Sequence, residues 1–231
     1  RNTAAGRMRL ATAADIVPGS MVRVGDTIGP AGIYASQKDH FIFLVDTNHP
    51  LEIGGTVKYR GVFLKGSEVG DSCEELTMFL YETVCGNHIV WNVPWTRKIS
   101  IVHKGNADVQ VIQALENDLG KFAEMGMERD QELIMNASAR MLGDTPQEVT
   151  TLLWSKRLVG ISKKEIEQVV TVEAPEAAEK GELGKGVSPR SVWGVVQGIT
   201  RLSQKTSKGA KWADARVGLD AVAGKVLEMA F

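Results

Sequence analysis

The sequence predicts an α+β protein, in which an antiparallel β-meander in the N-terminal half is packed by helices from the C-terminal half. Two observations support this prediction. Before about residue 105, short runs rich in β-branched and aromatic residues are separated by Gly, Pro, Asn and Asp. After that point, apolar residues recur at the spacing of amphipathic helices. With 231 residues, of which 24% are charged, the chain is long enough to bury a substantial core.

Six strands are expected in the N-terminal half, over residues 21–24, 33–35, 41–46, 56–64, 76–84 and 88–93. The fourth strand alternates apolar residues with the cations Lys58 and Arg60. This alternation is typical of a half-buried antiparallel strand, here with a basic outer face. Glycines between the runs supply the turns, because they tolerate positive φ.

Six helices are expected in the C-terminal half, over about residues 108–124, 127–142, 146–156, 162–170, 188–205 and 211–229. Thr145 and Glu148 form the capping-box pattern at the start of the third helix, with Pro146 at its first position, and Ser162 and Glu165 repeat the pattern. Residues 171–187 are polar and poor in bulky apolar side chains, so a flexible linker is expected there. The expected domains are a core of β-meander plus helices over residues 1–170 and, after the linker, a C-terminal helical pair over residues 188–231 that packs on the core.

The charge is balanced over the whole chain, with 27 basic and 28 acidic residues. Between residues 185 and 216, however, there are seven Lys/Arg and only one acidic residue. The near-neutral total excludes a protein that binds polyanions over its entire surface, and it leaves room for a local basic stripe. No apolar run approaches the ~20 residues that cross a bilayer, so we expect no membrane association. Two cysteines do not make a disulfide scaffold, and a cytoplasmic location is expected.

A search for catalytic chemistry finds little. A zinc set would need Cys73, Cys85, His88 and His103. Their spacing lacks the paired halves of structural zinc sites, so no metal is expected, and Cys85 is expected to be a buried structural thiol. Residues 184–186 (GKG) lack the spacing and the preceding strand of a phosphate loop. The sequence therefore predicts neither an enzyme nor a cofactor.

The expected helix over residues 188–205 carries its cations on one narrow face. Apolar residues cover the opposite side, and Trp193 lies at the border. A structural helix usually intersperses glutamates four positions from such cations, whereas a row of cations beside an aromatic suits a phosphate backbone with a stacked base. An ordinary solvated face is the open alternative. The candidate nucleic-acid-binding residues are Arg190, Trp193, Arg201, Lys205, Lys208, Lys211, Lys58 and Arg60.

Two blocks of the sequence resemble the phage and plasmid proteins catalogued as domain-of-unknown-function family 932. The first runs over residues 61–91, ends near the family's VC-x-N signature at 84–87, and is followed by its I-x-H-x-G segment at 101–105. The second, residues 191–200 (SVWGVVQGIT), looks like the family's W-G-x-x-x-A-[VI]-T helix, with Gly198 where the family has Ala and with Arg201 and Leu202 in place of its aromatic and acidic residues. The resemblance, over about residues 20–231, implies a product of a phage or mobile element that acts in the host cytoplasm.

The order of elements, a β-meander followed by helices, is similar to the core of single-strand annealing recombinases, which form rings or filaments with DNA along a basic groove. This similarity implies a single-stranded DNA-binding or annealing protein of recombination or replication that self-assembles as a homo-oligomer. The alternative is a phage structural or assembly protein with no nucleic-acid role, whose Gly-rich strand edges pair between subunits. A zinc- or cysteine-dependent enzyme is a third hypothesis, for which no ordered site can be assembled.

Overall fold

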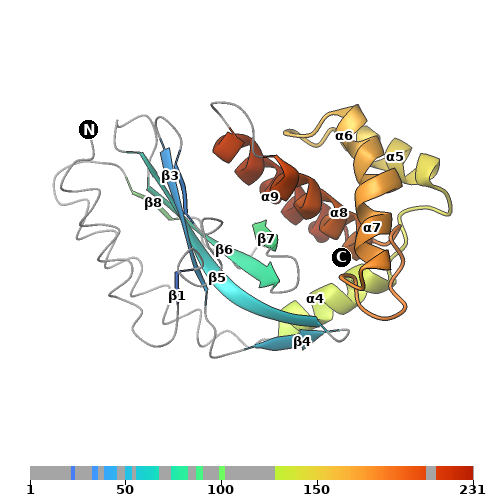
Figure 1. Cartoon of the computed structure of the whole chain (residues 1–231), viewed down its shortest axis with the longest axis horizontal. Coiled ribbons are helices and arrows are strands. Elements are labelled where there is room, and N and C mark those ends of the chain that lie inside the picture. The colour runs from blue at the N-terminus through green and yellow to red at the C-terminus, as the bar shows by residue number, and fades with distance from the viewer. Residues whose placement is uncertain are drawn as a thin grey trace. The chain divides into compact units, whose positions relative to one another are not determined.

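In the computed structural model the chain forms two compact units. Figure 1 labels the helices and strands. The structure describes residues 22–23, 33–35, 39–45, 50–53, 56–67, 74–82, 87–90, 99–101, 128–206 and 212–230. The first unit comprises residues 1–50, 59–79 and 94–126, and the second comprises residues 51–58, 80–93 and 127–231.

Described strands of the first unit are β1 (Val22–Arg23), β2 (Ile33–Ala35), β3 (Asp39–Val45), the larger part of β5 (Thr56–Ser67), the first part of β6 (Glu74–Glu82) and β8 (Ile99–Ile101). β3 pairs antiparallel with β5 along its whole length, from Asp39 opposite Ser67 to Val45 opposite Gly61. β1 and β2 both pair with β3 as well, at its end and its beginning. Because a strand has two edges, these two short strands share the edge of β3 that β5 leaves free.

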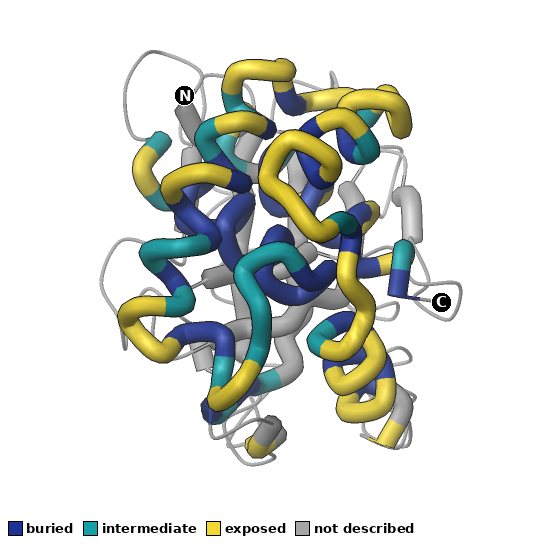
Figure 2. The backbone as a smooth tube through the Cα atoms, turned by 90° about the vertical axis from the view of Figure 1, so that its right-hand side faces the viewer, coloured by how far each residue is buried: buried dark blue, intermediate teal, exposed yellow. Residues whose placement is uncertain are grey.

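The second unit contains β4 (Leu51–Ile53), the start of β5, β7 (Asn87–Val90) and the described helices. These are α4 (Glu128–Ala139), α5 (Pro146–Ser155), α6 (Lys163–Gln168), the π-helix η2 (Val169–Glu173), α7 (Ala174–Glu179), α8 (Val192–Lys205), α9 (Trp212–Leu227) and the 3-10 helix η3 (Glu228–Ala230). α8 is the central helix, because it contacts α4, η2, α7, α9 and β7. Residues 192–203 of α8 are all buried, and exposed turns surround the buried segments in Figure 2.

Helix starts follow the local capping signals. Ser162 accepts a hydrogen bond from the amide of Glu165, whose carboxylate accepts one from the amide of Ser162, so the predicted capping box is confirmed. Thr145 also caps α5 as predicted, although the Glu148 carboxylate accepts from Asp144 instead of from the cap residue. A capping residue satisfies amide donors that the first helical turn leaves without partners.

α8 begins later than the sequence predicts. Its cap is Ser191, whose hydroxyl accepts from the amide of Gly194 at 3.0 Å and donates to the carbonyl of Ser188 at 2.7 Å. Residues 188–190 form a turn in front of the helix. Arg190 therefore precedes α8 and does not extend the cationic row of that helix.

Close packing explains a glycine inside α8. A methyl group added to Gly198 would lie 3.0 Å from atoms of both Ala174 and Val169, which is tighter than ordinary van der Waals contact. Gly198 therefore lets α8 approach the η2–α7 stretch closely. At Gly194 an added methyl group would collide with the carbonyl oxygen of Ser188, so the preceding turn also lies directly against the helix.

The predicted fold class is wrong. No β-meander packed by helices is found among the described residues. Described residues from 128 onward are mostly helical, with a single isolated bridge between Met141 and Ser191. The strand pairings also depart from a meander, because β1 and β2 share β3 and β8 pairs with β6. Sequence alternation predicts that a segment is extended but not which strand it pairs with, and strands of two or three residues cannot cover the full length of a longer neighbour.

The flexible linker predicted for residues 171–187 is also wrong. The π-helix η2 continues directly into α7, and Glu173, Ala174, Ala177 and Leu183 of this stretch are buried. Ala and Glu are strong helix formers, and the small side chain of alanine suits a close helix–helix contact. The polar composition that predicted a linker therefore belongs to a packed helix. Because the second unit includes residues 127–231 without interruption, no boundary between units falls at residues 171–187.

Several predictions lie outside the described residues. These are the helix over residues 108–124 and the thiol and imidazole groups of Cys73, Cys85 and His103. Of the proposed zinc set, only the backbone of His88 is described, as part of β7. Across the described ranges, no three His, Cys, Asp or Glu side chains gather as metal ligands. The same ranges hold no helix with the length and apolar character that crossing a membrane requires.

Candidate nucleic-acid interface

Trp193, which the sequence predicts to stack on a base, is a core residue. Its side chain is 1% exposed, near the N-terminus of α8. The Nζ of Lys58 lies 5.1 Å from the centre of its ring, and Lys58 is equally buried and donates a hydrogen bond to the hydroxyl of Thr56. An ammonium over an indole face is stabilised by the ring quadrupole. Neither side chain reaches solvent, so the predicted basic outer face of this strand is wrong at Lys58.

Arg201 is held by glutamates from outside its own helix. Its Nη1 donates to both carboxylate oxygens of Glu182 at 2.7 and 2.8 Å, and its Nη2 donates to Glu176 at 2.9 Å. The side chain of Arg201 is only 8% exposed. Nη1 and Nη2 thus bind two different carboxylates, and charge-assisted hydrogen bonds of this kind hold the guanidinium in place.

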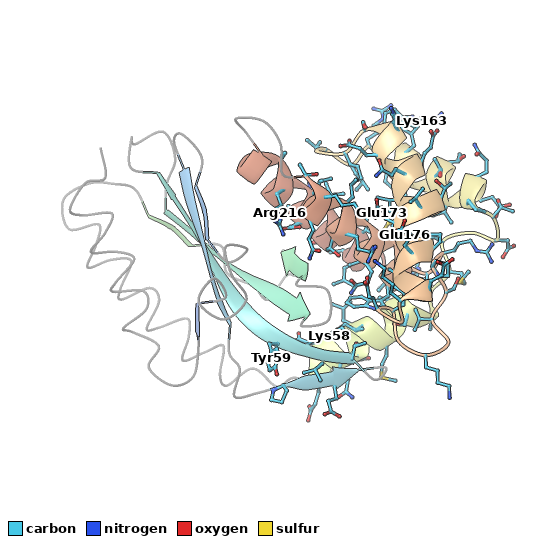
Figure 3. The ribbon with its side chains drawn as sticks, viewed as in Figure 1. Lys58, Tyr59, Lys163, Glu173, Glu176 and Arg216 are labelled. Carbon is cyan, nitrogen blue, oxygen red and sulfur yellow. The ribbon has the colours of Figure 1, made fainter. Side chains whose placement is uncertain are left out.

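Lys205 completes the same cluster one turn further along α8. Its Nζ donates to the two oxygens of Glu173 at 2.8 and 2.6 Å and lies 3.5 Å from Glu176. Glu173 itself is buried to 1% exposure at the end of the π-helix, where it also accepts from Gln168 at 3.0 Å. Figure 3 labels Glu173 and Glu176 on adjacent turns of this helical stretch. We call the five charged residues the α8 ion network (Arg201, Lys205, Glu173, Glu176 and Glu182).

Charges in the α8 ion network do not favour a phosphate ligand. Two cations face three carboxylates, so the cluster has a formal charge of −1. The hydrogen bond from Arg201 and the charge of Lys205 lower the pKa of Glu176. The hydrogen bond to Glu173 raises the pKa of Lys205. Both effects stabilise the charged forms of the pairs. Each cation already has a carboxylate partner, although the Lys205 side chain is 49% exposed.

At Arg201 and Lys205 the predicted basic stripe is therefore paired with carboxylates. The sequence argument looked for compensating glutamates four positions away on the same helix. The glutamates that compensate these cations are 19 to 32 positions away in the chain, in the stretch predicted as a linker. Of the other candidates, Arg190 is half-buried in the turn before α8, and only the backbone of Arg60 is described, within β5. Lys208 and Lys211 lie outside the described residues.

A different basic surface lies on the segment of residues 149–164, which the sequence reading passed over. It contains four cations and no acidic residue. Val149, Leu153 and Ile161 anchor it in the core, whereas Trp154 is 50% exposed and Val159 is 80% exposed. The signal in the sequence was the tryptophan followed by the pairs Lys156-Arg157 and Lys163-Lys164. These cations do not recur at helical spacing along one helix, so periodicity does not reveal them.

The cations of the 149–164 segment are largely unpaired. Within the described residues, the exposed side chains of Lys156, Arg157 and Lys164 have no ion-pair partner. Lys163 lies 4.0 Å from Glu167 in an exposed pair of the kind that contributes little to stability. Figure 3 labels Lys163 at the outer end of α6. These cations therefore remain open to an anionic partner.

Two local features of the 149–164 segment lower the stability of the folded protein. Arg157 has φ 51° in the turn that ends α5, a left-handed conformation that costs a non-glycine residue about 1 kcal/mol or more. Lys163 and Lys164 occupy the first turn of α6, where the positive end of the helix dipole disfavours cations. Local costs of this kind concentrate at functional sites.

A buried carboxyl between α8 and α9 forms a second unusual group. Asp220 is 2% exposed, and burial raises the pKa of Asp220 to about 7, against the opposing effects of a hydrogen bond with Ser203 and the charge of Arg216. The Ser203 hydroxyl lies 3.2 Å from the carbonyl of Arg216 and donates to it. Burial of Asp220 therefore favours the neutral acid, whereas Ser203 and Arg216 favour the carboxylate.

We expect Asp220→Asn to remove a pH dependence of stability. The folded protein keeps the Asp220 proton up to about pH 7, whereas the unfolded chain releases it near the ordinary value of 3.8. The stabilisation by the neutral acid is therefore full below about pH 4 and is lost progressively as the pH rises to about 7. The free energy of unfolding of the variant, relative to wild type, should rise by about 1.4 kcal/mol per pH unit across this window. Urea titrations at several pH values measure the difference, and parallel profiles for the two proteins would contradict it.

Comparisons with known proteins give no family: no family model, no curated protein and no solved structure matches the chain. The resemblance to domain-of-unknown-function family 932 therefore stays a prediction from the motifs quoted above.

Proposed function

We propose that this protein binds single-stranded DNA of a phage or mobile element and promotes annealing during recombination or replication in the host cytoplasm, as a self-assembling protein without bond chemistry. One observation above all supports the proposal. The 149–164 segment presents unpaired cations beside an exposed tryptophan on an anchored turn. Such a combination suits a ligand with both phosphates and bases.

Charge pairing distinguishes the 149–164 segment from the predicted basic stripe of α8. In the α8 ion network each cation has a carboxylate partner, and binding a phosphate would require breaking an existing pair. In the 149–164 segment a phosphate would replace only water and counterions. Release of those counterions favours binding and makes the affinity fall with salt.

The test is the salt dependence of oligonucleotide binding. We expect the full-length protein to bind a fluorescent single strand of about 20 nucleotides, with an affinity that falls as salt rises from about 50 to 300 mM. A Lys156→Ala/Arg157→Gly variant should lower the slope of log affinity against log salt by about 1.4, at about 0.7 per lost phosphate contact. Glycine is used at position 157 because it adopts the left-handed conformation without cost, so folding is retained.

A matched control removes two positive charges elsewhere. Lys180 and Lys185 are exposed in the same unit but outside the 149–164 segment, and Lys180→Ala/Lys185→Ala should leave the slope close to that of wild type. If both double variants lower the slope equally, the effect comes from net charge and not from the 149–164 segment. Absence of binding at low salt would end the nucleic-acid proposal and favour the alternative, a structural or assembly protein of the phage.

A further inference from the structure

We infer that Trp154 is a base-stacking residue that makes the 149–164 segment selective for single strands. This inference rests on the proposed function, because it concerns the same surface, and it assigns the ligand's exposed bases to one side chain. Single strands differ from duplexes in offering unstacked base faces, so the aromatic residue decides the selectivity. The cations alone would bind either form.

Position favours Trp154 for this role. It lies in the last turn of α5, and the amide of Arg157 donates to its carbonyl at 3.1 Å, so the chain turns directly after it. Lys156 and Arg157 follow Trp154 within three positions of the chain, and both are exposed. Within the described part of the chain, Trp154 makes no hydrogen bond or ring contact with another side chain. Its exposed half is therefore free to meet a base.

The contrast with Trp193 supports the assignment. Trp193 is buried and already has a cation over its ring, so a base cannot reach it. Trp154 has an exposed ring, and the nearby residues Lys156 and Arg157 have no ion-pair partner within the described residues. Among the exposed large apolar side chains described here, only Trp154 and Val159 belong to the basic segment, and only the tryptophan has an aromatic face.

The proposed binding mode therefore has two parts. One base stacks on the indole of Trp154, and the adjacent phosphates contact the cations that follow it in the segment. Stacking of this kind tolerates any base, because every base has a π-face. The site should accordingly bind single strands of different sequence with similar affinity.

The experiment compares three probes of about 20 units: a single-stranded DNA, the duplex of the same sequence, and an abasic strand that keeps the sugar-phosphate backbone but has no bases. Trp154→Ala should weaken binding of the single strand about 5- to 150-fold and leave binding of the abasic strand unchanged. Trp154→Phe should fall between wild type and the alanine variant, because phenylalanine keeps a smaller aromatic face. Met135→Ala, which removes another exposed apolar side chain, is the matched control and should bind as wild type does.

Outcomes separate this inference from the proposed function. If the single strand binds with the expected salt dependence and Trp154→Ala binds it as wild type does, the stacking inference fails while the proposed function stands. Equal loss of binding for the single and abasic strands would also overturn stacking, since it would indicate a damaged backbone site. If none of the probes binds at low salt, the proposed function itself fails. A selective loss for the single strand supports both.

Discussion

Replacing Arg201 with alanine is expected to lower the free energy of unfolding by about 3–5 kcal/mol, because it leaves buried carboxylates without their partner. Glu182 would lose both of its hydrogen bonds from the guanidinium, and it is 7% exposed. Water cannot replace the lost donors at such a site without opening the contact between α8 and the stretch that precedes it. Urea unfolding followed by circular dichroism measures the change.

A matched control shows whether the loss of stability comes from the buried position of Arg201 or from removing any arginine. Arg157→Ala removes the same side chain from an exposed position and should change the free energy of unfolding by less than about 0.5 kcal/mol. A double variant, Arg201→Met/Glu182→Met, should recover much of the loss, since an apolar pair can replace a buried ion pair of similar volume. A change below about 1 kcal/mol for Arg201→Ala would restore the interpretation of this α8 face as solvated.

Replacing Trp193 with alanine should cost about 3–5 kcal/mol of stability, the range for a fully buried large aromatic side chain. The substitution opens a cavity beside the central helix and removes the ring from below the buried ammonium of Lys58. Trp193→Phe should cost less, because it fills most of the volume and keeps an aromatic face towards the cation. The midpoint of thermal unfolding measures both changes.

The exposed tryptophan provides the control for the buried one. Trp154→Ala removes an equal side chain at 50% exposure and should leave the thermal midpoint near that of wild type, while it weakens binding of the single strand. Trp193→Ala should do the reverse: the fraction that stays folded should bind as wild type does. If Trp193→Ala instead left stability intact and abolished binding, the assignment of roles to the two tryptophans would be wrong.

Local signals in the sequence predicted the helical elements well. Ser162 and Glu165 form their capping box because both partners lie within one turn, and no distant residue can alter that geometry. Thr145 and Pro146 determine the start of α5 in the same way. The prediction failed where a local signal had two meanings. The Ala- and Glu-rich composition of residues 171–187 suits a solvated linker and a packed helix equally well, and only the contact with α8 distinguishes them.

The candidate site shows the same division. The sequence alone determined that Arg201 and Lys205 lie on one face of a helix, because helical periodicity is a local property. Only the tertiary structure decided what that face meets, since Glu173, Glu176 and Glu182 come from another part of the chain and neutralise it. Burial is likewise a tertiary property, so equal residues receive different roles: Trp193 fills the core and Trp154 is exposed. Helical phase and caps depend on neighbours within about four positions, whereas charge pairing and exposure depend on which distant segments fold against them.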